Sequence, residues 1–242
     1  MRRIVSSAIV TLAATVGYAA DITFTSDGLI QDGDVYDKVA VYDTPPNLTT
    51  VTMTGGTVNS SVILYDASIF NMTDGFVLQI AALNSGKINI QGGTAARVFA
   101  LGTGTANVYG GNVGVFGVEA WGSGTVNVYD GSIDYYIAAF ESGTINMYGG
   151  QIDDFITAGD QSIINFFGYG FTYDPTGGSG SSRPLVSGYW LDGTPFEFHL
   201  ENTETFDHVR LLPEPQTIYC LLGGLSIIVL RIRKTGKIRI LS

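Results

Sequence analysis

Between Thr52 and Tyr169, apolar and polar residues alternate in short runs that recur along the chain. In the run Thr125–Tyr129, the two valines share one face, and the threonine, asparagine and tyrosine share the other. This alternation predicts a short strand with one buried face. The Asp-Gly or Gly-Gly pair that follows each run predicts a turn that needs positive φ.

The run returns at a nearly constant interval. Its asparagine recurs every 18 to 20 residues, at Asn71, Asn89, Asn107, Asn127, Asn146 and Asn165. A turn glycine keeps the same interval, at Gly56, Gly75, Gly93, Gly111, Gly131 and Gly150. Repeats made of helix pairs need more than about 30 residues, whereas about 19 residues suit one coil of short strands. We therefore predict an all-β fold, a parallel β-helix (β-solenoid) of about seven 18–20-residue coils over residues 51–170, expected to be right-handed.

Alanine occupies the position seven residues before five of these asparagines, and a large residue usually follows it. These alanines are Ala82, Ala100, Ala120, Ala139 and Ala158. A residue that stays small through five coils indicates an inward site whose volume is fixed by the neighbouring coils.

The segments that flank the repeat are predicted to cover its ends. Residues 21–50 are polar and rich in turns, with short strands expected at Ile22–Phe24 and Val39–Tyr42, and are interpreted as an N-terminal cap or an irregular first coil. Residues 171–212 are predicted to be a loop followed by a β cap on the C-terminal end.

The predicted C-terminal cap contains a hairpin signal. Leu185–Trp190 and Pro195–Leu200 are strand-like runs joined by a turn that contains Asp-Gly. A third strand is expected at Val209–Leu212.

The two termini carry the pattern of an exported protein. Residues 1–20 begin with two arginines, continue with an apolar run and end in small residues, as a secretory signal peptide does. At the other end, the Pro213-Glu214-Pro215 motif precedes the mostly apolar run Ile218–Leu230. A basic cluster follows that run, at Arg231, Arg233 and Lys234.

This tripartite tail, residues 213–242, resembles the sorting tail of PEP-CTERM proteins. In that family an exosortase, a membrane-embedded transpeptidase similar to cysteine proteases, recognises and cleaves the tail. The resemblance implies the Sec export machinery and an exosortase as partners, and a C-terminal apolar helix that crosses the inner membrane before processing. It also implies a final location at the cell surface, the outer envelope or the extracellular polymer matrix of a Gram-negative-type bacterium.

Charge and cysteine content narrow the function classes. Between Asp21 and Arg210 the chain has 21 acidic residues but five basic ones, so nucleic acid is not expected as a partner. The single cysteine, Cys220, allows no disulfide within the chain, so stacking must hold the fold together.

Outward-facing aromatic residues should stack on successive coils. They are Tyr109, Tyr129, Tyr148 and Phe167. One interpretation is an aromatic strip that binds the sugar rings of an extracellular polysaccharide. The other is a ladder that only stabilises the stack.

Acidic residues stack as well. Asp134 and Asp153 lie one coil apart, with Asp154 adjacent, and stacked carboxylates can hold calcium. Such a site would suit a β-helical polysaccharide lyase or hydrolase, but no lysine or arginine lies nearby in the repeat, and a solvated acidic face is the favoured interpretation. His199 and His208 lie in no catalytic or metal-ligand pattern.

The sequence therefore predicts no cofactor and no catalytic residue. The leading hypothesis is an exported, non-catalytic structural protein or adhesin of the cell surface or extracellular matrix. The alternatives are a carbohydrate-binding module that uses the tyrosine strip and, third, a polysaccharide lyase or hydrolase.

Overall fold

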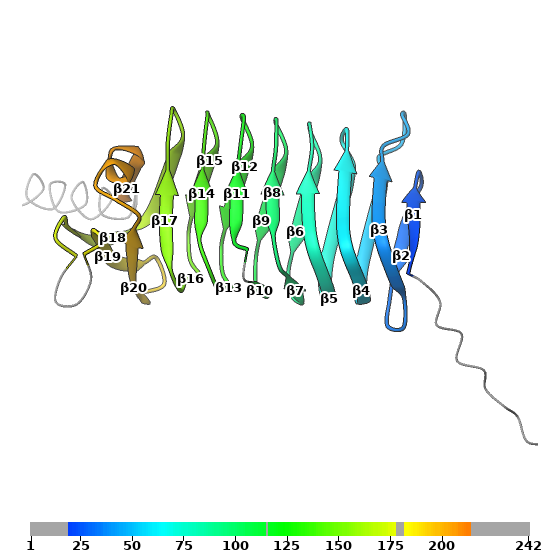
Figure 1. The fold of residues 1–242 in the computed structure, drawn as a ribbon, viewed down its shortest axis with the longest axis horizontal. Helices are drawn as coiled ribbons and strands as arrows, with labels where there is room; N and C mark the ends of the chain where they lie inside the picture. Colours follow the sequence, from blue (N-terminus) through cyan, green and yellow to red (C-terminus); the bar gives the residue numbers. More distant parts are fainter. Residues whose placement is uncertain (1–18, 115, 178–181, 214–242) are drawn as a thin grey trace, which may run out of the picture.

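The computed structural model describes residues 19–114, 116–177 and 182–213. They form a rod in which coils of about 19 residues stack along the long axis, with parallel pairing between successive coils (Figure 1). The prediction of an all-β parallel β-solenoid is confirmed. The rod has about eight turns, one more than expected.

Each central coil contributes three short strands, which form three faces of the rod. The first face contains Lys87–Ile90 (β6), Thr105–Val108 (β9), Thr125–Val128 (β12) and Thr144–Met147 (β15). The second face contains Thr94–Ala95 (β7), Asn112–Val113 (β10), Ser132–Ile133 (β13) and Gln151–Ile152 (β16). The third face contains Val98–Ala100 (β8), Val118–Ala120 (β11), Ile137–Ala139 (β14) and Phe155–Ala158 (β17).

Five strands build the N-terminal coils, and the last three are the long ones. They are Ala20–Phe24 (β1), Gly28–Ile30 (β2), Val35–Tyr42 (β3), Thr50–Tyr65 (β4) and Ile69–Ala82 (β5). Strands β2 and β3 both pair in parallel with β4, and β1 pairs in parallel with β3. Residues 21–50 therefore form a coil in register with the rest, which helps to explain the additional turn. The strands expected at Ile22–Phe24 and Val39–Tyr42 lie within β1 and β3.

The register of the repeat is the one that the sequence predicts. Asn127 in β12 pairs with Asn107 on one side and Asn146 on the other. On the third face, Ala120 pairs with Ala100 and Ala139 in the same way. Identical residues therefore stack one coil apart, at the strand spacing of about 4.8 Å.

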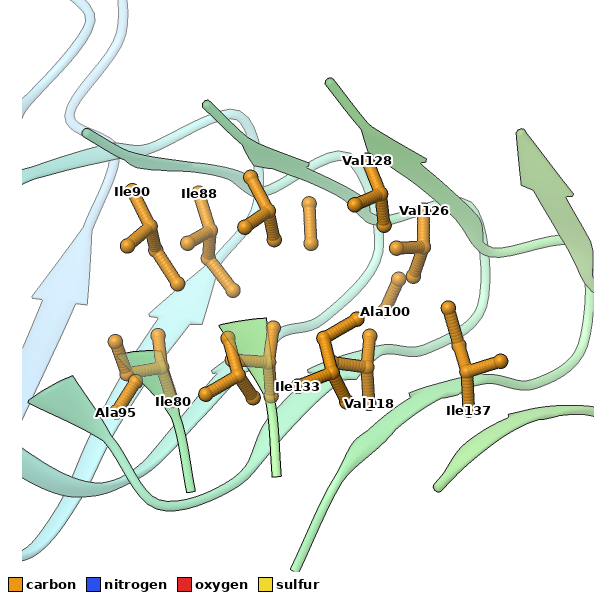
Figure 2. Close-up of a cluster of buried hydrophobic side chains, with 14 of the residues drawn as sticks. Ile80, Ile88, Ile90, Ala95, Ala100, Val118, Val126, Val128, Ile133 and Ile137 are labelled. Atoms are coloured by element: carbon orange, nitrogen blue, oxygen red, sulfur yellow. The ribbon is translucent and has the colours of Figure 1, made fainter. Parts of the chain in front are cut away.

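The core lies inside the coils. Val126 and Val128 on the first face are fully buried and point toward Val118 and Ile137 on the third face (Figure 2). Ala120, on the third face, is also fully buried, as the alanine repeat predicts. Because every coil buries its apolar face against the coils on both sides, the stack is stabilised mainly by neighbour contacts.

The turn glycines are required by the backbone. Gly131 has φ of +104°, in the left-handed region, and a Cβ there would lie 2.9 Å from the carbonyl oxygen of Gly111 in the preceding coil. Only glycine allows both this conformation and this close approach.

The C-terminal end is closed by four strands. They are Ile163–Asp174 (β18), Leu185–Trp190 (β19), Pro195–Leu200 (β20) and Val209–Pro213 (β21), with a short 3₁₀ helix, Glu204–His208 (η1), before the last. Strands β18, β19 and β20 pair antiparallel in sequence, so the predicted hairpin is confirmed. Strand β20 then pairs in parallel with β17, and β21 with β18, so the cap strands extend the rod and cover its last edge.

An aromatic cluster fills the end of the rod under this cap. The ring centroids of Phe166 and Phe196 are 5.8 Å apart, and those of Trp190 and Phe196 are 4.2 Å apart. The expected signal peptide, apart from its last two residues, and the apolar helix of the tail lie outside the described residues. Within the described part of the chain, no helix has the length and apolar character needed to cross a membrane.

Candidate functional site

The aromatic ladder forms as the sequence predicts, along the turn that follows the first face. The rings of Tyr109 and Tyr129 stack with centroids 4.8 Å apart and planes 7° apart, and those of Tyr129 and Tyr148 at 4.9 Å and 6°. Phe167 continues the stack at 4.3 Å from Tyr148. Tyr109 and Tyr129 are more than two-fifths exposed.

This stacking decides which parts of the rings a ligand can contact. The inner rings, Tyr129 and Tyr148, have an aromatic neighbour on both faces. A sugar ring packs on an aromatic face, and these faces are already covered. The ladder therefore presents ring edges and hydroxyl groups to solvent, and its rings act on one another as stacked cross-strand pairs.

A groove of about 670 Å³ lies where the ladder meets the C-terminal hairpin. Its lining includes Tyr129 and Tyr148 of the ladder and residues of the hairpin between Trp190 and Phe198. Turn glycines and residues of the second-face strands β13 and β16 also line it. The Trp190 indole Nε1 donates to the carbonyl oxygen of Gly150 at 3.3 Å, which holds the hairpin against this turn.

The groove is acidic. Its lining includes Asp130, Asp153, Asp192 and Glu197, and no lysine or arginine among the described residues that line it. The Asp192 carboxylate accepts a hydrogen bond from the backbone N–H of Thr194 at 2.8 Å. Hydrogen bonds from Thr194 lower the pKa of Asp192. The groove therefore suits an uncharged or cationic ligand better than an anionic one.

The three stacked aspartates do not gather into one group. Asp134 accepts a hydrogen bond from the Ser132 hydroxyl at 3.0 Å, whereas Asp154 forms an ion pair with Arg183 at 2.6 Å. No group of three His, Cys, Asp or Glu side chains in the described residues is placed to hold a metal ion. Asp153 remains exposed beside the groove.

Arg183 is a neighbour of these aspartates that the repeat pattern does not reveal. It comes from the segment before β19, and its guanidinium also lies 4.6 Å from the centre of the Phe155 ring. The sequence observation that no lysine or arginine lies nearby in the repeat considers the repeat alone, and Arg183 reaches Asp154 from the cap.

A second polar cluster, on the third face, also escapes the repeat pattern. Glu119 is only 4% exposed although it points away from the core of the coil. Its Oε1 accepts from Arg97 Nε at 3.0 Å and from the Tyr136 hydroxyl at 2.6 Å, and its Oε2 accepts from Trp121 Nε1 at 2.7 Å. Three side chains, one from each of three coils, thus converge on one carboxylate. The signal in the sequence is a glutamate in the position that holds alanine, phenylalanine or threonine in other coils.

The charges in this cluster are tied to each other. Burial would lower the pKa of Arg97, but its hydrogen bond and attraction to Glu119 raise it above the ordinary value. Burial raises the pKa of the Tyr136 hydroxyl, and the hydrogen bond to Glu119 raises it further. Because both carboxylate oxygens of Glu119 already accept hydrogen bonds, the cluster works as a clamp between coils.

Both histidines lie in the cap and away from the groove. His199 lies on β20, where its register partner in β17 is Phe155. His208 Nδ1 lies 3.1 Å from the carbonyl oxygen of Ser162, which ties η1 to the rod. Of the predicted sorting motif, Pro213 ends β21, and Glu214, Pro215, Arg231, Arg233 and Lys234 lie outside the described residues.

In comparisons with known proteins, no family model, curated protein or solved structure matches the chain.

Proposed function

We propose that this protein is an exported, non-catalytic structural protein or adhesin of the cell surface or extracellular matrix, sorted through its PEP-CTERM-like tail. The observation that carries the proposal is where the first and last described strands lie relative to the two expected signals. Strand β1 begins at Ala20, the last residue of the expected signal peptide, and β21 includes Pro213, the first residue of the sorting motif. Removal of both signals would therefore take at most one terminal residue from each of these two strands.

The side chains of the rod support a structural role. The asparagine ladder is continuous, with each amide Nδ2 donating to the Oδ1 of the asparagine one coil earlier at 2.8–2.9 Å, from Asn165 back to Asn71. Glu119 and Asp154 are engaged by arginines. These polar groups bind one another along the rod, as expected of a scaffold.

The sorting proposal is tested by the mass and location of the native protein. We expect a mature chain that starts near Ala20 and ends close to Pro215, recovered from the outer fraction or the medium. Replacing Pro213 and Pro215 with alanine should leave the full-length C-terminus in the inner membrane. The matched control is Pro184→Ala, which lies outside the tail and should be processed normally. Native protein that is recovered only with an intact tail in the inner membrane would refute the proposal.

The groove favours carbohydrate binding as the second candidate function. It is open to solvent, and it offers ring edges, hydroxyls and carboxylates that can bond to sugar hydroxyls. Because the faces of the inner tyrosine rings are covered, a glycan would bind in this groove and not by packing on those faces.

Binding of immobilised neutral, amino-bearing and uronate-bearing oligosaccharides tests this second function. Neutral or amino sugars should be retained, and Asp153→Asn or Glu197→Gln should weaken their retention at least several-fold. Asp74→Asn, an exposed aspartate outside the groove, serves as the control. Preferential binding of uronates, or equal loss in the control, would exclude the groove as the site.

A further inference from the structure

The tyrosines of this rod are arranged in pairs to an unusual degree. Seven of those in the described residues stack face to face on another tyrosine. The pairs are Tyr42–Tyr65 at 4.4 Å and 1°, Tyr109–Tyr129 at 4.8 Å and 7°, Tyr129–Tyr148 at 4.9 Å and 6°, and Tyr169–Tyr189 at 5.4 Å and 17°. Each of these pairs lies in, or directly after, two strands that are neighbours in the sheet.

The paired rings are also accessible. Tyr42 is 38% exposed, Tyr109 44% and Tyr129 41%, so a small oxidant or a radical carrier can reach the ring edges that carry the hydroxyls. Tyr65 and Tyr148 are partly exposed beside them. Proximity and access to solvent therefore coincide in these residues.

We propose that the stacked tyrosines are sites of oxidative cross-linking, at which neighbouring coils become joined by dityrosine bonds. A one-electron oxidant, such as a haem peroxidase with hydrogen peroxide, removes one electron and one proton from each phenol. The two phenoxyl radicals couple through a ring carbon beside each oxygen, forming one carbon–carbon bond. The hydrogens on these two carbons leave as protons while the oxygens regain theirs, so the pair loses two electrons and two protons in total. One peroxide accepts them and becomes two waters.

The fold limits each radical to its stacked neighbours before oxidation. Tyr42 and Tyr65 are register partners in β3 and β4, and Tyr109, Tyr129 and Tyr148 each follow register partners in β9, β12 and β15. Holding two reactants in place makes a bimolecular step effectively unimolecular, which favours coupling inside one molecule over coupling between molecules.

Such bonds would supply a covalent staple that the chain otherwise lacks, because its single cysteine allows no disulfide within it. Each bond would close a loop of one coil and reduce the freedom of the unfolded chain, as a disulfide does. The inference concerns the rod itself and holds whether or not the groove binds a glycan.

The test is oxidation of the purified full chain with hydrogen peroxide and a haem peroxidase. We expect a monomer that is lighter by two hydrogen atoms for each bond, with dityrosine fluorescence. Peptide mapping should link Tyr42 to Tyr65, and Tyr129 to Tyr109 or Tyr148. Tyr173, which stacks on Phe206 at 3.6 Å, is the internal control and should stay unlinked.

Phenylalanine variants separate the sites without removing the stacked rings. Tyr65→Phe should abolish the link to Tyr42 and keep the links of Tyr129. Tyr129→Phe should abolish its own links and keep the link between Tyr42 and Tyr65. The same chain oxidised in denaturant should give mixed links, many of them between molecules. The proposal is overturned if the native protein gives the same links as the denatured chain, links only between molecules, or no dityrosine under conditions in which the denatured chain forms it.

Discussion

Replacing Asn127 with aspartate would test whether the asparagine ladder holds the coils together through its hydrogen bonds. The side-chain Nδ2 of Asn127 donates to Asn107 Oδ1 at 2.9 Å, and its Oδ1 accepts from Asn146 Nδ2 at 2.8 Å. Aspartate has the same shape and keeps the second bond. It loses the first, and it turns a carboxylate oxygen toward the oxygen of Asn107.

The magnitude follows from burial. Asn107 is only 5% exposed, so water cannot replace the lost donor. Leaving a buried acceptor without its donor costs about 1–3 kcal/mol, and the adjacent negative charge places Asn127→Asp at the upper end of that range. Asn71 is the matched control because it begins the ladder. Its Oδ1 accepts from Asn89, while its Nδ2 donates to no asparagine, so Asn71→Asp should change stability by less than about 0.5 kcal/mol.

The cost should also depend on pH. The new carboxyl at position 127 faces an oxygen and is half-buried, so its pKa in the folded protein should lie above the unfolded value of about 3.9. Below that value both states are protonated, and the protonated group can donate to Asn107, so the penalty is small. As the pH rises through the unfolded pKa toward the folded one, the unfolded state ionises first and the penalty grows.

Urea unfolding, followed by circular dichroism and by the fluorescence of Trp121 and Trp190, measures these differences at pH values of about 3 and about 7. Equal losses for Asn71→Asp and Asn127→Asp, or a loss for Asn127→Asp that does not change with pH, would refute the reasoning.

Three other predictions follow from the same contacts. Ala120→Leu should overpack a fully buried site and cost about 1–3 kcal/mol in urea unfolding, and an unchanged midpoint would contradict the packing described. Because the pKa of Tyr136 is raised in the folded state, its contribution to stability should be complete below the unfolded value of about 10 and fall as pH rises above it. Tyr136→Phe should flatten this alkaline decline, and an identical pH profile would argue against it. Micromolar calcium should not raise the melting temperature, and a rise that Asp153→Asn abolishes would show a calcium site that we do not expect.

The parts of the fold that repeat could be predicted from the sequence, because identical residues at equal intervals report a register directly. Asn127 and Ala120 identify their partners one coil away without any structure. The hairpin could be predicted as well, since the Asp-Gly turn lies between two strand-like runs.

The parts that depend on contacts across the cap could not. Arg183 reaches Asp154 from a segment with no repeat, and Glu119 gathers partners from three coils with no common spacing. The parallel pairing of β20 with β17 depends on how the hairpin folds back, which local turn chemistry does not specify. The groove exists only because the hairpin folds back against the rod. The candidate site therefore depends on tertiary structure, even though Tyr129 and Tyr148 were already recognisable in the sequence.

The equal register of the central coils has a consequence for how such a protein can change over generations. The segment Thr125–Gly143 begins at one position of the repeat and ends just before the same position in the next coil, at Thr144. Duplicating or deleting a stretch of this size in the gene would lengthen or shorten the rod by one strand spacing, about 4.8 Å, and leave both ends unaltered. Rod length is therefore a trait that can vary in steps, so that related molecules could differ in the distance between the two ends of the rod.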